Sequence, residues 1–182
     1  MNATTMEKYK WFWPWQDEKE EAWLGKMARQ GWHLVKPDFL GQYTFAAGTG
    51  RDMVFRMDFV SNSKRDASYL QLFQDTGWEH VGELAGWQYF RKPASLGNMP
   101  EIFTDNASKI AKYRRLLLAL TIFLPIITTI FMSTRTSIFV NTTNSNHDLA
   151  VTVIGFVASA VVLVYIVIAI GILWRINQLK KS

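Results

Sequence analysis

Residues 24–43 read LGKMARQGWHLVKPDFLGQY, and residues 70–89 read LQLFQDTGWEHVGELAGWQY. A shift of 46 positions, without a gap, superposes six identical pairs: Leu24/Leu70, Gly31/Gly77, Trp32/Trp78, Val35/Val81, Gln42/Gln88 and Tyr43/Tyr89. Self-similarity at a fixed period indicates that one supersecondary unit occurs twice. The sequence therefore predicts an internal duplication in the first half of the chain.

Each copy of the repeat predicts the order β-α-β-β. The period-2 alternation of large and small or polar side chains predicts the strands at residues 11–15, 32–36, 42–46, 53–60, 78–82 and 87–92. The pairs Asp17/Glu20 and Ser63/Asp66 resemble capping boxes at the helix starts. Gly31 and Gly77 are expected to end the helices, because glycine tolerates the left-handed conformation.

A duplicated β-α-β-β unit most economically forms one antiparallel sheet with two helices on one face. We therefore predict an α+β domain over residues 1–93. Its element order is similar to that of GyrI-like effector-binding domains, which pair two such units around a cleft for small apolar ligands. This similarity is one of element order only, and it implies a fold and no chemistry.

The second half of the chain is dominated by two uncharged apolar runs, Leu116–Met132 and Ala150–Trp174. A transmembrane helix needs roughly 20 apolar residues, so both runs are expected to cross a bilayer as a two-helix hairpin. The predicted organisation is a duplicated domain at 1–93, a linker and basic juxtamembrane helix at 94–115, spans at 116–132 and 150–174, an extracytoplasmic loop at 133–149 and a cytoplasmic tail at 175–182. Asp105 is the expected cap of the juxtamembrane helix.

Charge is divided between the two halves. Residues 1–93 carry 12 Lys or Arg against 12 Asp or Glu, whereas residues 94–182 carry 8 against 3, so the net charge of +5 belongs to the second half. Basic residues flank the outer ends of the two apolar runs, which predicts a multi-pass protein of the cell membrane with both termini cytoplasmic. Nucleic-acid binding needs a clustered cationic surface, and the neutral domain argues against it.

The residues give no signal for an enzyme. With no Cys, disulfides, thiolate metal sites and a Cys nucleophile are excluded. Phosphate-binding loops, nucleophile elbows and zinc motifs are absent from the sequence, so we expect no catalytic residues, no metal and no cofactor. The acidic cluster Asp17, Glu18, Glu20 and Glu21 is explained by the helix macrodipole, which favours acids in the first turn.

Aromatic side chains are the most suggestive feature of the domain. An aromatic-lined pocket for a flat or cationic amphiphile is one interpretation, because such rings offer apolar area and cation–π faces. The candidate ligand-binding residues are Trp32, Tyr43, Trp78, Trp87, Tyr89 and Arg56. The alternatives are that these rings fill a small core, or that some Trp side chains face the bilayer interface. Arg56 and Asp58 share one face of their strand and are expected as a surface pair.

The string Trp11-Phe12-Trp13-Pro14-Trp15, the segments Glu21–Leu24 and Gly31–Leu34, and the ends Gly77-Trp78-Glu79 and Tyr89–Pro93 resemble the bacterial domain-of-unknown-function family numbered 2812. Members of that family are commonly followed by membrane helices and often lie near PadR-type regulators. The resemblance implies no established activity and no site residues.

These observations favour a membrane-tethered, non-enzymatic sensing or regulatory module at the cytoplasmic face. Its expected partners are the lipid bilayer, a small amphiphilic ligand, and a membrane protein or a second copy of the chain. The alternative is a structural or accessory subunit of a membrane protein complex.

Overall fold

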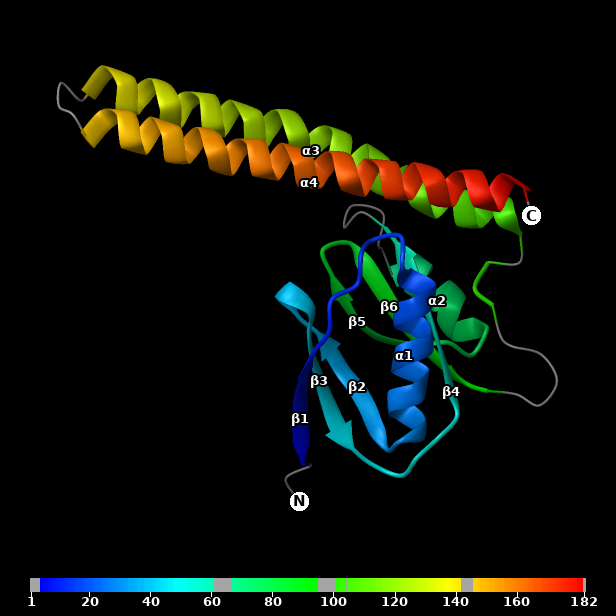
Figure 1. The fold of residues 1–182 in the computed structure, drawn as a ribbon. Helices are drawn as coiled ribbons and strands as arrows, with labels where there is room; N and C mark the ends of the chain where they lie inside the picture. Colours follow the sequence, from blue (N-terminus) through cyan, green and yellow to red (C-terminus); the bar gives the residue numbers. More distant parts are fainter. Residues whose placement is uncertain (1–3, 61–66, 95–100, 104, 142–145, 182) are drawn as a thin grey trace. The chain divides into compact units, whose positions relative to one another are not determined.

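The computed structural model describes residues 4–60, 67–94, 101–103, 105–141 and 146–181 (Figure 1). The chain divides into two compact units, Met1–Lys112 and Tyr113–Ser182. The elements are β1 (Thr5–Tyr9), α1 (Asp17–Arg29), β2 (Trp32–Pro37), the 3-10 helix η1 (Phe39–Gly41), β3 (Gln42–Ala47), β4 (Met53–Phe59), α2 (Ala67–Asp75), β5 (Glu79–Leu84), β6 (Trp87–Pro93), α3 (Asn106–Asn141) and α4 (Asn146–Lys181). The α+β class and the twofold β-α-β-β order are confirmed.

The two copies share their topology in detail. The sheet orders are β1-β3-β2 and β4-β6-β5, and every pairing is antiparallel. Both copies carry a register shift at the same repeat position, between Leu34 and Lys36 in β2 and between His80 and Gly82 in β5. Gly31 and Gly77 have φ angles of 85° and 82°, as expected for left-handed residues that end helices. The duplication predicted from the 46-residue shift is therefore a structural one.

The prediction of a single sheet is wrong, because the six strands form two three-stranded sheets. The edge strands β2 and β5 lie beside one another at the boundary. Both β2 and β5 contain a bulge. A bulge bends a strand and interrupts its row of ladder hydrogen bonds. Pro37 at the end of β2 also lacks a backbone donor.

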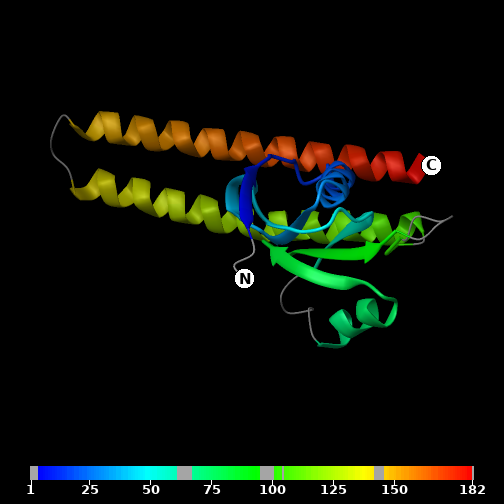
Figure 2. The ribbon, with the colours of Figure 1, turned by 90° about the horizontal axis from the view of Figure 1, so that it is seen from below.

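The prediction that both helices share one face is also wrong (Figure 2). α1 packs into the larger core cluster with strands of both sheets: Trp23, Leu24, Met27, Ala28, Leu34, Tyr43, Phe45, Phe55, Met57 and Tyr89. α2 packs on the opposite face of the second sheet, in a cluster of Val54, Phe73, Trp78 and Phe90. Because successive strand residues point to opposite faces, Tyr89 and Phe90 belong to different clusters. The second sheet is thus covered on both faces.

The strand predicted at residues 11–15 is wrong, since β1 lies earlier, at Thr5–Tyr9. The Trp-rich segment forms a turn in which the Gln16 N–H donates to the Trp13 carbonyl oxygen at 2.8 Å. Pro14 cannot donate to a ladder, and the rings of Trp13 and Trp15 stack with centroids 5.2 Å apart. The alternating Trp residues of this segment therefore belong to a turn with stacked rings and not to a β-strand.

The capping-box prediction is wrong for the first helix. The residue before α1 is Gln16, which makes no side-chain cap, and Asp17 and Glu20 turn into the protein instead. Ser63 and Asp66, the predicted cap of the second helix, lie outside the described residues. Asp105 does cap α3, because its carboxylate accepts from the Ser108 N–H at 2.6 Å.

The second unit consists of the remainder of α3 and of α4, which run in opposite directions (Figure 1). The two predicted spans are both helical: α3 contains Leu116–Met132, and α4 contains Ala150–Trp174. Pro125 lies inside α3, where the hydroxyls of Thr128 and Thr129 both donate to its carbonyl oxygen. Among the described residues, one helix is apolar and long enough to cross a membrane, Val153–Lys181, with a mean hydropathy of 2.9.

Candidate functional site

The N-terminal half of α1 buries three carboxyl groups. Asp17, Glu20 and Glu21 are 2%, 6% and 7% exposed, which is rare for acids unless each has a partner. Their spacing of three and four residues places them on one side of the helix, in line with the apolar side chains Leu24 and Ala28. We call Asp17, Glu20 and Glu21 the acidic face of α1.

Glu20 joins the two copies of the repeat. Its Oε1 atom accepts a hydrogen bond of 2.8 Å from the hydroxyl of Tyr43 and another of 2.8 Å from the hydroxyl of Tyr89. These tyrosines occupy the same position in the two repeats. Burial raises the pKa of Glu20, and the two hydroxyl donors oppose that rise by stabilising the carboxylate. Burial and the neighbouring carboxylate raise the pKa of both tyrosines, which therefore stay protonated as donors.

Glu21 binds the edge of the second sheet. Its Oε1 accepts from the Met57 N–H at 2.8 Å, and its Oε2 lies 3.4 Å from Nη1 of Arg56. Burial and the nearby charge of Asp17 raise the pKa of Glu21 to about 8, with Lys112 and Arg56 opposing the rise. At neutral pH this carboxyl therefore holds its proton, and its carbonyl oxygen still accepts from Met57.

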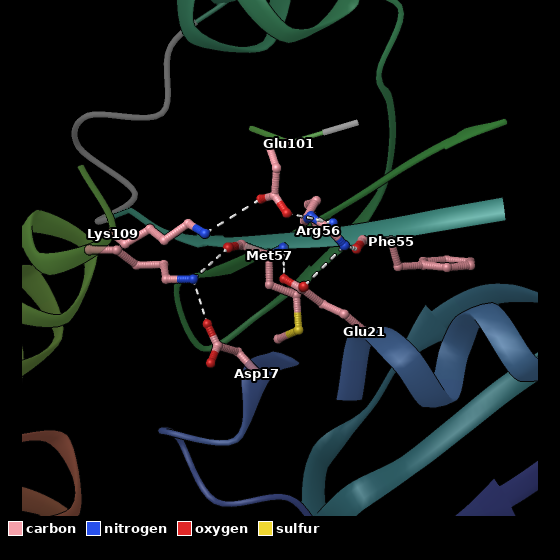
Figure 3. Close-up of polar contacts among 8 residues, drawn as sticks. Asp17, Glu21, Phe55, Arg56, Met57, Glu101 and Lys109 are labelled. Atoms are coloured by element: carbon pink, nitrogen blue, oxygen red, sulfur yellow. Dashed lines mark hydrogen bonds and ion pairs between the residues drawn. The ribbon is translucent and has the colours of Figure 1, made fainter. Parts of the chain in front are cut away.

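Asp17 reaches the beginning of α3. Its Oδ2 pairs with the ammonium of Lys112, which is 5% exposed and also donates to the Met57 carbonyl oxygen at 3.2 Å (Figure 3). The same ammonium lies 5.9 Å from the ring centroid of Trp87 and 5.6 Å from that of Phe103, within cation–π range. A buried cation is thus surrounded by an anion, a carbonyl and two aromatic rings.

A second route connects the same two helices. Nη2 of Arg56 donates to Glu101 at 2.8 Å, and Glu101 lies 3.8 Å from the ammonium of Lys109 in α3 (Figure 3). Glu21, Arg56, Glu101 and Lys109 therefore form a chain of polar contacts from α1, across β4, to the beginning of α3. Nε of Arg56 is buried without a hydrogen-bond partner among the described residues. We call Asp17, Glu21, Arg56, Glu101, Lys109 and Lys112 the α1–α3 network.

The predicted ligand-binding residues are divided by the fold. Tyr43 and Tyr89 meet at Glu20, and Trp32 and Trp87, both partly exposed, pack against the same core cluster. Trp78 lies in the other cluster, on the opposite face of the second sheet. Four of the six residues therefore belong to or pack against one core cluster, and two of them, Tyr43 and Tyr89, bind the Glu20 carboxylate.

Arg56 and Asp58 do not form the predicted surface pair. Arg56 pairs with Glu21 and Glu101, while Asp58 is 3% exposed and accepts from the Tyr69 hydroxyl at 3.1 Å. The two histidines of the domain have separate contacts. Nε2 of His33 lies 2.8 Å from the Thr49 carbonyl oxygen, and Nε2 of His80 lies 2.9 Å from Oε1 of Gln88. Within the part of the chain that the structure describes, no group of three or more His, Cys, Asp or Glu is placed to hold a metal ion.

Sequence reasoning missed the acidic face, because the macrodipole alone explains acids in a first helical turn. A signal was present in the spacing. Counting back from Leu24 by four and by seven reaches Glu20 and Asp17, and counting back from Ala28 by seven reaches Glu21. Acids on the apolar stripe of a helix indicate buried partners. Lys112, 95 residues away from Asp17, carried no such signal.

The acidic face connects α1 to three parts of the domain. Each acidic group is held by partners from a different element, so a displacement of α1 changes contacts with both sheets and with the beginning of α3 at once. Glu21, with its raised pKa, adds a group whose charge changes near neutral pH.

In the second unit, α4 borders an apolar groove of about 330 Å³, lined by Phe156, Val157, Ala160, Val161, Val164 and Tyr165. The Gly155 backbone beside it is open, because a Cβ at this position would meet no atom of the described residues within 4 Å. Large apolar side chains of α4 are exposed, such as Phe156 at 78% and Leu163 at 62%.

The fold and the buried network define the class: a duplicated β-α-β-β domain continued by long apolar helices, with its first helix tied by charges to the start of α3. The chain belongs to the family described as "Protein of unknown function (DUF2812)", whose family model matches residues 16–125. The match contains Asp17 and Lys112 and begins after the Trp11–Trp15 string. Comparisons with curated proteins and with solved structures gave no match.

Proposed function

We propose that this protein is a membrane-tethered, non-enzymatic sensing or regulatory module whose duplicated domain acts at the cytoplasmic face. The observation that carries the proposal is the buried ion pair between Asp17 of α1 and Lys112 of α3. A charge pair of this kind is costly to break, so the positions of α1 and of the beginning of α3 depend on each other. Binding of a small amphiphile or a protein to the domain would thus change the position of the beginning of α3.

The membrane anchor in this proposal is the hairpin of α3 and α4, with both termini cytoplasmic. Support comes from the exposed apolar surface of α4 and from the helical state of Leu116–Met132. In water, large exposed side chains such as Phe156 and Leu163 would be unfavourable by about 25 cal/mol per Å² of apolar surface, whereas lipid removes that cost. The basic ends, Arg114 and Arg115 before one run and Lys180 and Lys181 after the other, suit the cytoplasmic side.

The topology is testable because the chain has no Cys. Single cysteines at Asn144 and at Gln178 are labelled in intact cells with a membrane-impermeant maleimide. The proposal expects labelling of N144C in intact cells and labelling of Q178C only after permeabilisation. Labelling of both positions in intact cells, or of neither until permeabilisation, would contradict a two-span hairpin with this orientation.

The ligand hypothesis is tested with the full chain in lipid nanodiscs. Alkyl trimethylammonium and alkyl glucoside compounds are titrated while Trp emission and thermal unfolding are followed. We expect a saturable shift that Trp87→Phe reduces and that Trp174→Phe, a matched control in α4, leaves unchanged. If no saturable shift is seen, small amphiphiles of these two classes are excluded as ligands, and a protein partner is the remaining candidate.

The alternative function is an accessory subunit that assembles through its helices. The apolar groove on α4 and the open backbone at Gly155 favour it, since small residues let helices approach closely. Cross-linking in native membranes separates the two functions. A partner that is still captured after deletion of residues 1–93 supports the accessory role, whereas one lost with the domain supports the regulatory role.

A further inference from the structure

The turn between β1 and α1 displays aromatic rings to solvent. Tyr9 and Trp11 are 68% and 61% exposed, and Phe39 of the neighbouring η1 is 71% exposed. Trp13 and Trp15 are partly exposed. We call Tyr9, Trp11, Trp13, Trp15 and Phe39 the aromatic loop.

The aromatic loop is held in shape by its own contacts. The Lys10 N–H donates to the Gly41 carbonyl oxygen at 2.7 Å, which fixes the turn containing Phe39 against the segment containing Trp11. Gly41 has a φ of 73°, and a Cβ there would lie 2.6 Å from the Lys10 carbonyl oxygen, so only glycine permits this approach. Trp11 packs edge-on against Trp13 with centroids 6.0 Å apart, and Trp13 stacks on Trp15. The three Trp rings therefore form one stacked group, and the backbone contact holds the turn containing Phe39 beside it.

Chain connections limit how far this surface can be from the first residue of the apolar run. Trp15 precedes Asp17 by two residues, and Asp17 pairs with Lys112. Lys112 precedes Leu116, the first residue of the run, by four residues, and four residues reach at most about 14 Å.

The chemistry of the aromatic side chains indicates which partner the aromatic loop contacts. Trp and Tyr side chains combine apolar area with a polar N–H or O–H, and they concentrate at the headgroup level of bilayers. Exposed Trp rings that the chain tethers near the start of a membrane helix suit that level better than water.

We propose that the aromatic loop is a second membrane contact, which inserts into the headgroup region of the bilayer that holds α3 and α4. This inference rests on the membrane anchorage proposed above. It assigns the loop a partner, the phospholipid surface, that is separate from any ligand or protein bound by the domain.

The test uses three full-length single-cysteine variants, Tyr9→Cys, Phe39→Cys and Leu72→Cys. Each carries a nitroxide label and is reconstituted in vesicles of phosphatidylcholine and phosphatidylglycerol. Leu72 is the matched control, because it is 63% exposed but lies on α2. We expect collisions with a water-soluble nickel chelate to be several-fold less frequent at residues 9 and 39 than at residue 72, with more frequent collisions with oxygen. Adding Trp11→Ser to the Phe39→Cys variant should move the label toward water.

Three results would overturn the inference. Labels at residues 9 and 39 that are as accessible to the chelate as the label at residue 72 would place the loop in water. Protection accompanied by spin–spin broadening that disappears on dilution with unlabelled chain would identify a second copy as the occupant. Protection found only in native membranes would identify a protein. Alkaline carbonate extraction of the same vesicles tests the anchor by itself, since release of the chain contradicts the anchorage and retention with a water-exposed loop contradicts only the loop contact.

Discussion

The two β-α-β-β copies have the same strand order, the same bulge and the same left-handed glycine, yet their helices are used differently. α1 packs into a core shared by both sheets and carries the buried acidic face. α2 covers the outer face of its own sheet through Phe73, and the position equivalent to Glu21 is Ala67. Duplication thus supplied the scaffold, while divergence of a few helix positions supplied the charged connection to α3.

The largest expected effect on stability comes from the carboxylate of Asp17, which only the first copy carries. Asp17→Asn keeps the size of the side chain and leaves the buried Lys112 ammonium without its anion, which should cost about 3–5 kcal/mol of unfolding free energy. Asp52→Asn is the control, because Asp52 forms an exposed pair with Arg29 at 2.9 Å and should cost less than about 1 kcal/mol. Thermal or denaturant unfolding of the full chain in detergent, followed by Trp emission, measures both. Equal costs would mean that the buried pair does not connect the helices.

The next effect is a pH dependence that belongs to the first copy alone. Glu21 has a pKa of about 8 in the folded protein and an ordinary value near 4.3 when unfolded, so the folded state binds the extra proton between these values. Its contribution to stability is present at low pH and is lost as pH rises from about 4.3 toward 8, by up to roughly 1.4 kcal/mol per pH unit. Glu20, whose pKa is also raised, acts in the same direction.

Glu21→Gln removes this titration while its amide oxygen still accepts from Met57. Unfolding temperatures between pH 5 and 8 should therefore fall less steeply for the variant than for the parent chain. Glu18→Gln, at an exposed position of the same helix, is the matched control and should leave the slope unchanged. A parent slope that is flat across this range, or one that Glu21→Gln leaves as steep, would contradict a buried protonated Glu21.

Equivalent glycines of the two copies should respond unequally. Alanine at either position adopts a left-handed conformation at a cost of about 1–2 kcal/mol. At Gly31 the new Cβ would also lie 2.6 Å from the Gly48 carbonyl oxygen, whereas at Gly77 the nearest atom is the flexible Lys92 side chain at 3.4 Å. Gly31→Ala should therefore destabilise the chain more than Gly77→Ala in the same unfolding assay. The reverse order would show that the first copy has room to adjust.

The smallest effects test where the copies are truly equivalent. Tyr43→Phe and Tyr89→Phe each remove one hydroxyl donor from Glu20, and each should cost about 1–2 kcal/mol. The double substitution should cost more than the sum, because Glu20 then loses both donors while it remains buried. Tyr9→Phe, at an exposed site, should have no effect. A clear difference between the two single variants would mean that the tyrosines are not interchangeable.

Several elements were predictable because their signals are local. The strands at residues 32–36, 42–46, 53–60 and 87–92 follow side-chain alternation, and Gly31 and Gly77 follow from the need for a positive φ at a helix end. The segment at residues 11–15 misled the prediction, since its alternation arises from stacked Trp rings. The family membership could also be read from the residues, and it is confirmed over residues 16–125.

The duplication, the α+β class and the separation of a neutral half from a basic, apolar half follow from the amino-acid sequence alone. These properties depend on periodicity and composition, which neighbouring residues express without reference to the rest of the chain. Three features emerge only when the chain is folded: the strands form two sheets, α1 and α2 lie on opposite faces, and Asp17 meets Lys112 across 95 residues. Such contacts depend on which surfaces pack together, and the energy of a buried charge is set by the partner that packing provides.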